Sequence, residues 1–216
     1  MSATQTIQVF SISTALMASG GIACLSLFDI PLLKSQPASR SLPMIRWLFS
    51  RGSHIFPTAA VSSASGFAYL AYTSIPTLST KTLSSLLQQA IKGKPGLYLA
   101  AAALSMSIAP ITSTMIPTNF RLIQKNEELG GSRSVKSAAY REHTGAKQRN
   151  AEESVEGKDD VSQWTDLSRP QEKTRKESTK EEDEEVRGLM DKFARLNMLR
   201  AVGIGAGGIV GLMAAL

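Results

Sequence analysis

The stretch APITSTMIPTNFRLI, residues 109–123, decides the fold. A long apolar segment ends there, and polar groups that include Asn119 follow where the apolar run stops. The end of the chain repeats this arrangement in FARLNMLRAVGIGAGG, residues 193–208, where Asn197 and Arg200 lead into glycine-rich apolar sequence. Amide and guanidinium groups are costly in an apolar layer, so their presence there indicates a use. We therefore interpret the two segment ends as walls of one candidate site.

Acidic residues are distributed very unevenly along the 216 residues of the chain. Between residues 1 and 123 the only acid is Asp29, and the other seventeen lie between residues 127 and 191. A water-soluble domain mixes charge along its length, so this separation indicates a membrane protein with one hydrophilic insert. The predicted fold class is therefore all-α: an integral membrane four-helix bundle that carries a charged cytosolic insert.

Four apolar segments are predicted to cross the bilayer as helices. The first is longer, at about 1.5 Å per residue, than the hydrocarbon core of roughly 30 Å. Small residues recur at every fourth position in all four segments, which lets transmembrane helices pack closely; Gly203, Gly207 and Gly211 are one such ridge. The predicted segments are residues 7–33, 54–74, 95–122 and 186–216.

Residues 124–185 differ from the rest of the chain in composition. They are rich in charged residues, serine and glycine, and contain two aromatic residues, Tyr140 and Trp164. Such a segment cannot bury enough apolar surface to become ordered, so we expect it to be disordered. The acidic run EEDEE, residues 181–185, complements a helix N-terminus, and the fourth helix is predicted to begin near it.

The fourth segment ends in an uninterrupted uncharged run of only sixteen residues, 201–216, which is about 24 Å of helix. Arg200 and Asn197 must therefore approach or enter the apolar layer. Both lie on one otherwise apolar helical face. An arginine there either faces the bundle interior or a wet cavity, or extends to the membrane boundary.

The basic residues predict the orientation in the membrane. Residues 34–53 contain Lys34, Arg40, Arg46 and Arg51 and no acid, and the insert holds many of the other basic residues. Both loops are therefore assigned to the cytosol, and four spans then put both termini on the non-cytosolic side. The lysines of the loop between the second and third segments oppose this assignment. An endomembrane location is expected.

Several function classes are not supported by the sequence. The net charge is +6, but aromatic and basic residues are not interleaved as in proteins that stack nucleic-acid bases, so no nucleic-acid partner is expected. The histidines, His54 and His143, are far apart, and no zinc-type spacing occurs, so a protein-held metal is not expected. The single cysteine, Cys24, cannot form an internal disulfide.

Three short motifs resemble the DUF1772 family of four-helix membrane proteins, which includes the fungal anthrone oxygenases of polyketide pathways. The first segment carries ASGGIACLSLFDIPLL, which is similar to a small-residue run of the family that ends in Ile-Pro. The third carries MIPTNFRL, similar to a Pro-x-Asn-x-x-Leu signature, and the last carries FARLNMLRAVGIGAG, similar to an aromatic-x-x-Leu-Asn-x-x-Arg motif. The aromatic residue of this motif is often Trp and is Phe193 here.

The resemblance implies oxidation of an anthrone to an anthraquinone by dioxygen, without flavin, haem or metal. This chemistry needs a base for the benzylic proton and a partner for the resulting oxyanion. Arg200 is the first candidate for the oxyanion partner. Asn119 and Asn197 are candidates for hydrogen bonds to ring oxygens, so they are substrate-binding candidates as well. Arg121 either binds substrate in the same way or extends to the membrane boundary.

His54 and Asp29 are the candidates for the base. His54 has a suitable intrinsic pKa, but its position at the start of a segment also fits an interfacial residue. Asp29 is either a base with a raised pKa or the ion partner of Arg200. The lipid bilayer and a hydrophobic aromatic polyketide are the expected partners. The alternative function is a non-catalytic membrane scaffold that recruits pathway partners through the charged insert; a small carrier is less well supported.

Overall fold

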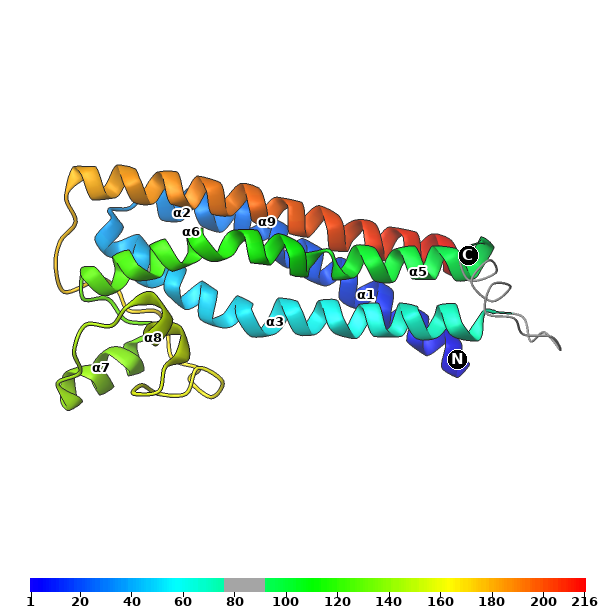
Figure 1. The fold of residues 1–216 in the computed structure, drawn as a ribbon, viewed down its shortest axis with the longest axis horizontal. Helices are drawn as coiled ribbons and strands as arrows, with labels where there is room; N and C mark the ends of the chain where they lie inside the picture. Colours follow the sequence, from blue (N-terminus) through cyan, green and yellow to red (C-terminus); the bar gives the residue numbers. More distant parts are fainter. Residues whose placement is uncertain (76–91) are drawn as a thin grey trace. The chain divides into compact units, whose positions relative to one another are not determined.

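The computed structural model describes residues 1–75 and 92–216, and the elements of secondary structure in this part of the chain are all helices (Figure 1). The all-α fold class predicted from the sequence is confirmed. The helices are α1 (Ala3–Cys24), η1 (Leu25–Asp29, a π-helix), α2 (Ile30–Lys34), α3 (Ala38–Thr73), α5 (Gly93–Met106), α6 (Ile108–Glu128), α7 (Val135–Thr144), α8 (Ala151–Glu156) and α9 (Lys180–Ala215).

Three helical stretches in the described residues are long and apolar enough to cross a membrane: Ala3–Lys34, Gly93–Glu128 and Lys180–Ala215. The second predicted span, residues 54–74, is the latter half of α3 and is not among them. Serine, threonine, tyrosine and glycine residues dilute the apolar residues of that half. Whether it crosses the membrane stays a prediction. Most of the loop that follows it lies outside the described residues.

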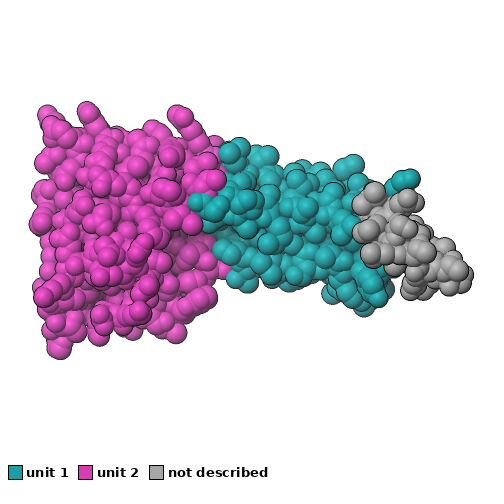
Figure 2. Space-filling model, in the orientation of Figure 1, with its two compact units in different colours: residues 1–24, 55–113, 197–216 teal, residues 25–54, 114–196 magenta. Residues whose placement is uncertain are grey.

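The chain divides into two compact units, coloured teal and magenta in Figure 2. Unit 1 contains residues 1–24, 55–113 and 197–216, and unit 2 contains residues 25–54 and 114–196.

The described residues of unit 1 form packed helices with an apolar core. The latter half of α3 and the end of α9 pack with α1 and α5, and each helix contributes fully buried side chains: Ala15, Ile22, Phe67, Leu70, Tyr98, Ala101 and Ile204. The outward faces stay apolar as well, since Phe10, Met17, Val202 and Ile209 are each more than half exposed. A unit that is apolar both inside and outside suits a lipid surrounding.

Small residues bring the helices of unit 1 together, as the sequence pattern predicted. A Cβ atom added at Gly207 of α9 would lie 2.9 Å from the carbonyl oxygen of Ala101 and 2.6 Å from Oγ of Ser105, both on α5. Polar contacts also link helices in this unit. Ser19 donates to the carbonyl of Ala201 at 2.8 Å, and the Gln8 amide donates to the hydroxyl of Tyr98 at 2.7 Å.

Unit 2 contains η1, α2 and the first part of α3, together with the C-terminal part of α6, the short helices α7 and α8, and the first part of α9. The expectation that residues 124–185 are disordered has to be corrected. Helix α6 continues to Glu128, and α7 and α8 follow with Ser134 and Asn150 as N-caps. Gly145 and Gly157 end the two short helices at positive φ, where glycine is favoured.

The insert is ordered because it buries paired charges instead of a large apolar surface. Glu127, Arg133 and Arg141 are each less than a tenth exposed. Backbone bonds tie the end of the insert to α3, since the N–H of Thr174 donates to the carbonyl of Ser39 at 2.8 Å. The rule that predicted disorder counts apolar burial alone, and it therefore missed this source of order.

Candidate active site and the charged core

Arg200 and Asn197 lie together on α9 inside unit 1. Their exposed fractions are 8% and 1%, and Nη1 of Arg200 donates to Oδ1 of Asn197 at 2.8 Å. The spacing of three residues on a helix puts both side chains on one face, and Ala201 and Ile204 of the apolar core are on the same helix. The side chains therefore face protein, as the first of the two sequence-based interpretations required.

This pair has the chemistry of an anion site in an apolar surrounding. A buried guanidinium keeps its charge and offers several N–H donors, and the hydrogen bond to Asn197 restricts its orientation. A charge in such a medium acts strongly on nearby developing charge, because water does not screen it. The arrangement is suited to an oxyanion that forms on a bound apolar molecule.

Asn119 and Arg121 lie on α6 in unit 2, and the structure gives them different surroundings. Asn119 is half-buried, and its Oδ1 atom is buried without a hydrogen-bond partner in the described residues. Arg121 is about half exposed, and its Nε and Nη2 atoms donate to Oε1 of Glu185 at 3.0 and 2.8 Å. Glu185 also pairs with Lys125 at 2.7 Å. Arg121 is therefore occupied by a surface ion pair about two turns before the end of α6, which favours a structural role over substrate binding.

His54 and Asp29, the candidate bases, also belong to unit 2. The His54 ring stacks on the Trp164 ring, with centroids 3.6 Å apart and an interplanar angle of 27°. Asp29 ends the π-helix at the start of α2 and is half-buried, and it makes no side-chain capping bond there. Convergence of these residues and of Asn119 with Arg200 and Asn197 stays a prediction, because Arg200 and Asn197 belong to the other unit.

A second polar centre, which was not predicted from the sequence, lies in unit 2. We call it the charged core. Glu127 pairs with Arg141 at 2.9 Å and with Arg149 at 3.1 Å, and Arg149 also pairs with Asp160 at 3.2 Å. Its members are Arg46, Glu127, Arg133, Arg141, Arg149, Asp160 and Asp166.

Arg46 of α3 joins the charged core through a backbone contact. Its Nη2 atom donates to the carbonyl of Ser154 in α8 at 2.8 Å, and the residue is 3% exposed. Burial and the nearby charge of Arg133 lower the pKa of Arg46 to about 10, against the opposing effect of Glu127. The core holds four guanidinium groups and three carboxylates, so the cations are in excess.

Local sequence signals for part of this centre were present. Asn150 and Glu153 form a reciprocal capping box at the start of α8, a pattern that is readable as Asn-x-x-Glu. The ion pairs themselves join residues up to 27 positions apart, as in Arg133 and Asp160, and spacing along one helix does not reveal them.

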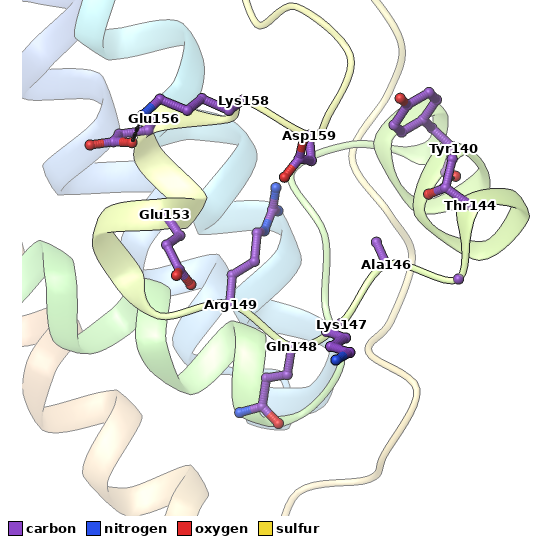
Figure 3. A pocket seen from close by; sticks show the side chains of 11 residues that line it. Tyr140, Thr144, Ala146, Lys147, Gln148, Arg149, Glu153, Glu156, Lys158 and Asp159 are labelled. Carbon is purple, nitrogen blue, oxygen red and sulfur yellow. Dashed lines mark hydrogen bonds and ion pairs between the residues drawn. The ribbon is translucent and has the colours of Figure 1, made fainter.

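A cavity of about 830 Å³ opens on the insert between α7 and α8 (Figure 3). Tyr140 and Thr144 line one wall of the cavity. The side chain of Arg149 extends into the cavity, and Asp159 lies near its guanidinium group. The lining mixes acids and bases, and the residues predicted from the sequence as catalytic do not line this cavity. In residues 1–75 and 92–216, no three His, Cys, Asp or Glu side chains form a group that could hold a metal ion.

The fold and the buried pair define a class: an all-helical membrane protein whose apolar core encloses an amide and a guanidinium group. A sequence model described as anthrone oxygenase matches residues 46–210, which is most of the chain and includes Asn119, Asn197 and Arg200. The chain belongs to the anthrone oxygenase family, with the oxygenase-like function of that family. No curated protein and no solved structure matches the chain.

Proposed function

We propose that this protein oxidises an anthrone-type polyketide to the anthraquinone with dioxygen and without a bound cofactor. The observation that carries the proposal is the Arg200–Asn197 pair, which is buried in the apolar unit of a chain that matches the anthrone oxygenase family. A flat aromatic substrate partitions into the bilayer, so it reaches an apolar helical unit laterally.

The reaction balances with dioxygen as the only oxidant. A base removes a proton from the benzylic carbon, and the resulting anion is delocalised onto the carbonyl oxygen. The carbanion reduces dioxygen and forms a carbon–oxygen bond, which gives a hydroperoxide after protonation. Loss of water breaks the oxygen–oxygen bond and leaves the second carbonyl, so one oxygen atom enters the product and the other leaves as water.

In this proposal Arg200 stabilises the anion that forms in the first step. The guanidinium donates to the substrate oxygen on which charge develops, and Asn197 holds the guanidinium and offers its amide N–H to a second ring oxygen. Exclusion of water by the apolar core protects the hydroperoxide from diversion. His54 and Asp29 are the two candidates for the base, and Asn119 is a further candidate for binding substrate oxygen.

The proposal is tested with membranes that contain the protein, an anthrone and dissolved oxygen, in the presence of a metal chelator. Wild type should form anthraquinone faster than membranes without the protein. Arg200→Ala should lower kcat by about 10²–10³-fold, which is typical for loss of an oxyanion donor. Asn197→Ala should cause a smaller loss, because the guanidinium remains.

Arg195→Ala is the matched control, since Arg195 is an exposed arginine on the same helix. It should keep the wild-type rate. Equal rates for Arg200→Ala and Arg195→Ala would refute the assigned site, and a wild-type rate no higher than that of empty membranes would refute the oxygenase proposal for that substrate. Loss of activity in chelator would refute catalysis without metal.

The same assay separates the two candidate bases. If His54 is the base, His54→Gln should remove the acidic limb of the pH–rate profile near neutral pH, and Asp29→Asn should leave the limb in place. The opposite result assigns proton removal to Asp29.

A further inference from the structure

A short loop of the insert presents apolar side chains to the outside. We call residues 162–168 the Trp164 loop. Trp164 is 71% exposed and Leu167 is 84% exposed, so both project from the surface. Large apolar side chains at such exposure on an otherwise charged insert indicate a partner that covers them.

Hydrogen bonds to Asp166 and Ser168 hold the Trp164 loop in place. The exposure of Trp164 and Leu167 is therefore not a result of loose packing. Asp166 is 4% exposed and accepts hydrogen bonds from the hydroxyl of Ser134 and from the backbone N–H of Ser168, the latter at 3.0 Å. Nε1 of Trp47 on α3 donates to the carbonyl of Ser168 at 2.9 Å. These anchors on either side fix the loop with Trp164 and Leu167 exposed.

The loop contacts α3 at His54, the last residue of this helix that belongs to unit 2. Trp164 stacks on His54, and Ile55, the next residue of α3, is 58% exposed. From Ile55 onward α3 belongs to the apolar unit 1. Trp164 therefore packs on the residue of α3 at which the second membrane span predicted from the sequence, residues 54–74, begins.

Two basic residues, Arg51 through its side chain and Lys136 through its backbone, contact the end of the loop. Nη2 of Arg51 lies 3.5 Å from the carbonyl of Ser168, and the backbone of exposed Lys136 donates to the Ser168 hydroxyl at 3.3 Å. Basic side chains beside an exposed tryptophan match lipid phosphates above an acyl-chain boundary. A soluble protein partner would not require basic residues and an exposed tryptophan beside the start of a predicted membrane span.

We infer that the Trp164 loop is an interfacial anchor that inserts Trp164 and Leu167 into the headgroup region of the bilayer. The indole ring suits this position because its body is apolar and its N–H is polar. The anchor holds the insert against the membrane surface beside His54. The inference does not depend on the proposed reaction.

A nitroxide label in the full-length protein tests this anchor in phosphatidylcholine–phosphatidylglycerol vesicles. Cys24 is the single cysteine, so Leu167→Cys in a Cys24→Ser background carries one label. The label should collide more often with oxygen, which concentrates in lipid, than with a water-soluble nickel chelate. Lys158→Cys in the same background is the matched control, because the Lys158 side chain is 81% exposed on the same insert. Its label should show the opposite preference.

A label at residue 167 that behaves like the label at residue 158 would overturn the inference. A label that is immobile and inaccessible to both reagents would also overturn it, because it would show a protein partner or a second copy on this surface. Trp164 gives an independent measurement, since the chain has two tryptophans. Brominated lipids should quench a larger fraction of the emission of the wild type than of Trp164→Phe, which keeps Trp47 and its hydrogen bond to Ser168, whereas equal fractions would contradict insertion.

Discussion

Among single residues, Glu127 is a buried acid of unit 2 that forms two ion pairs. It is 2% exposed and lies between Arg141 and Arg149. Removing one partner of a buried ion pair costs about 3–5 kcal/mol, because the remaining charges lose their compensation. We therefore expect Glu127→Gln to lower the free energy of unfolding by about that amount, measured as a large fall in the thermal midpoint in detergent.

Glu142→Gln is the control for this loss, because Glu142 is an exposed acid on α7 with no ion pair among the described residues. Surface changes of this kind stay within about 0.5 kcal/mol. If the two variants unfold at the same temperature, the charged core does not stabilise the protein in the way its geometry indicates.

Asp166 makes the Trp164 loop sensitive to acid. Burial raises the pKa of this carboxyl, but hydrogen bonds from Ser134 and Ser168 outweigh burial, so its pKa lies below the usual value near 3.9. A lowered pKa in the folded state means that the ionised carboxylate stabilises the fold above the unfolded pKa. This stabilisation is lost as the pH falls through the folded pKa.

The contribution of Asp166 to the unfolding midpoint of the wild type should therefore not change with pH near neutrality, and the midpoint should fall below about pH 4. Asp166→Asn should be less stable than wild type at neutral pH, and the difference should shrink in acid. Thermal unfolding followed across pH 3–7 measures both effects. A difference that stays constant over this range would show that ionisation of Asp166 does not contribute.

At the scale of elements, the small-residue ridge of α9 sets how closely the helices of unit 1 pack. A Cβ atom at Gly207 would meet the backbone of α5, with the Ala101 oxygen at 2.9 Å and the Ser105 nitrogen at 3.0 Å. Backbone atoms cannot move aside without shifting the helix. Gly207→Ala should therefore destabilise unit 1 by about 1–3 kcal/mol, as overpacking does.

Gly20→Ala on α1 provides the comparison, because no atom lies within 4 Å of a Cβ added at Gly20. Alanine in an open helical position should be neutral or stabilising by about 0.5–1 kcal/mol. Thermal midpoints in detergent compare the two variants directly. Equal midpoints would show that α9 and α5 are not packed at this distance.

The sequence predicted the helices and the ridge because these features depend on local periodicity. The acidic run at residues 181–185 lies in the first turns of α9, and Gly207 faces Ala101 and Ser105, the ridge expected on the third segment. The shortness of the last apolar run predicted that Asn197 and Arg200 approach the apolar layer but left two orientations open, and the structure shows both residues buried. The charged core was not predicted from the sequence, because its stability depends on which acid pairs with which arginine. Composition does not show those pairs.

At the scale of the whole molecule, the order of the insert changes how its role can be tested. Deletion of most of the insert would distinguish a scaffold from an enzyme only if the insert were independent of the helices. In the structure Arg46 of α3 donates to the carbonyl of Ser154 inside the insert. Deletion would leave this guanidinium buried without its acceptor, so point variants on the exposed face of the insert are the better test of recruitment.

The number of membrane crossings is the remaining question at this scale, and the latter half of α3 decides it. Its residues Phe67 and Leu70 are fully buried in the core of unit 1, together with residues of α1, α5 and α9. A helix that packs among three helices of membrane length is expected to share their surroundings, although its own composition does not reach that of the others. We therefore predict four crossings.

Counting crossings gives a direct test of this prediction. With four, the N-terminus and the insert lie on opposite sides of the membrane; with three, and α3 outside the bilayer, they lie on the same side. The chain has no Asn-x-Ser/Thr acceptor of its own, so introduced acceptors report without background. An acceptor in a hydrophilic extension before Met1 should be glycosylated, and Glu142→Asn, which completes an acceptor with Thr144, should not be. Modification of both or of neither would contradict four crossings, whereas modification of the insert alone would keep four crossings and reverse the predicted orientation.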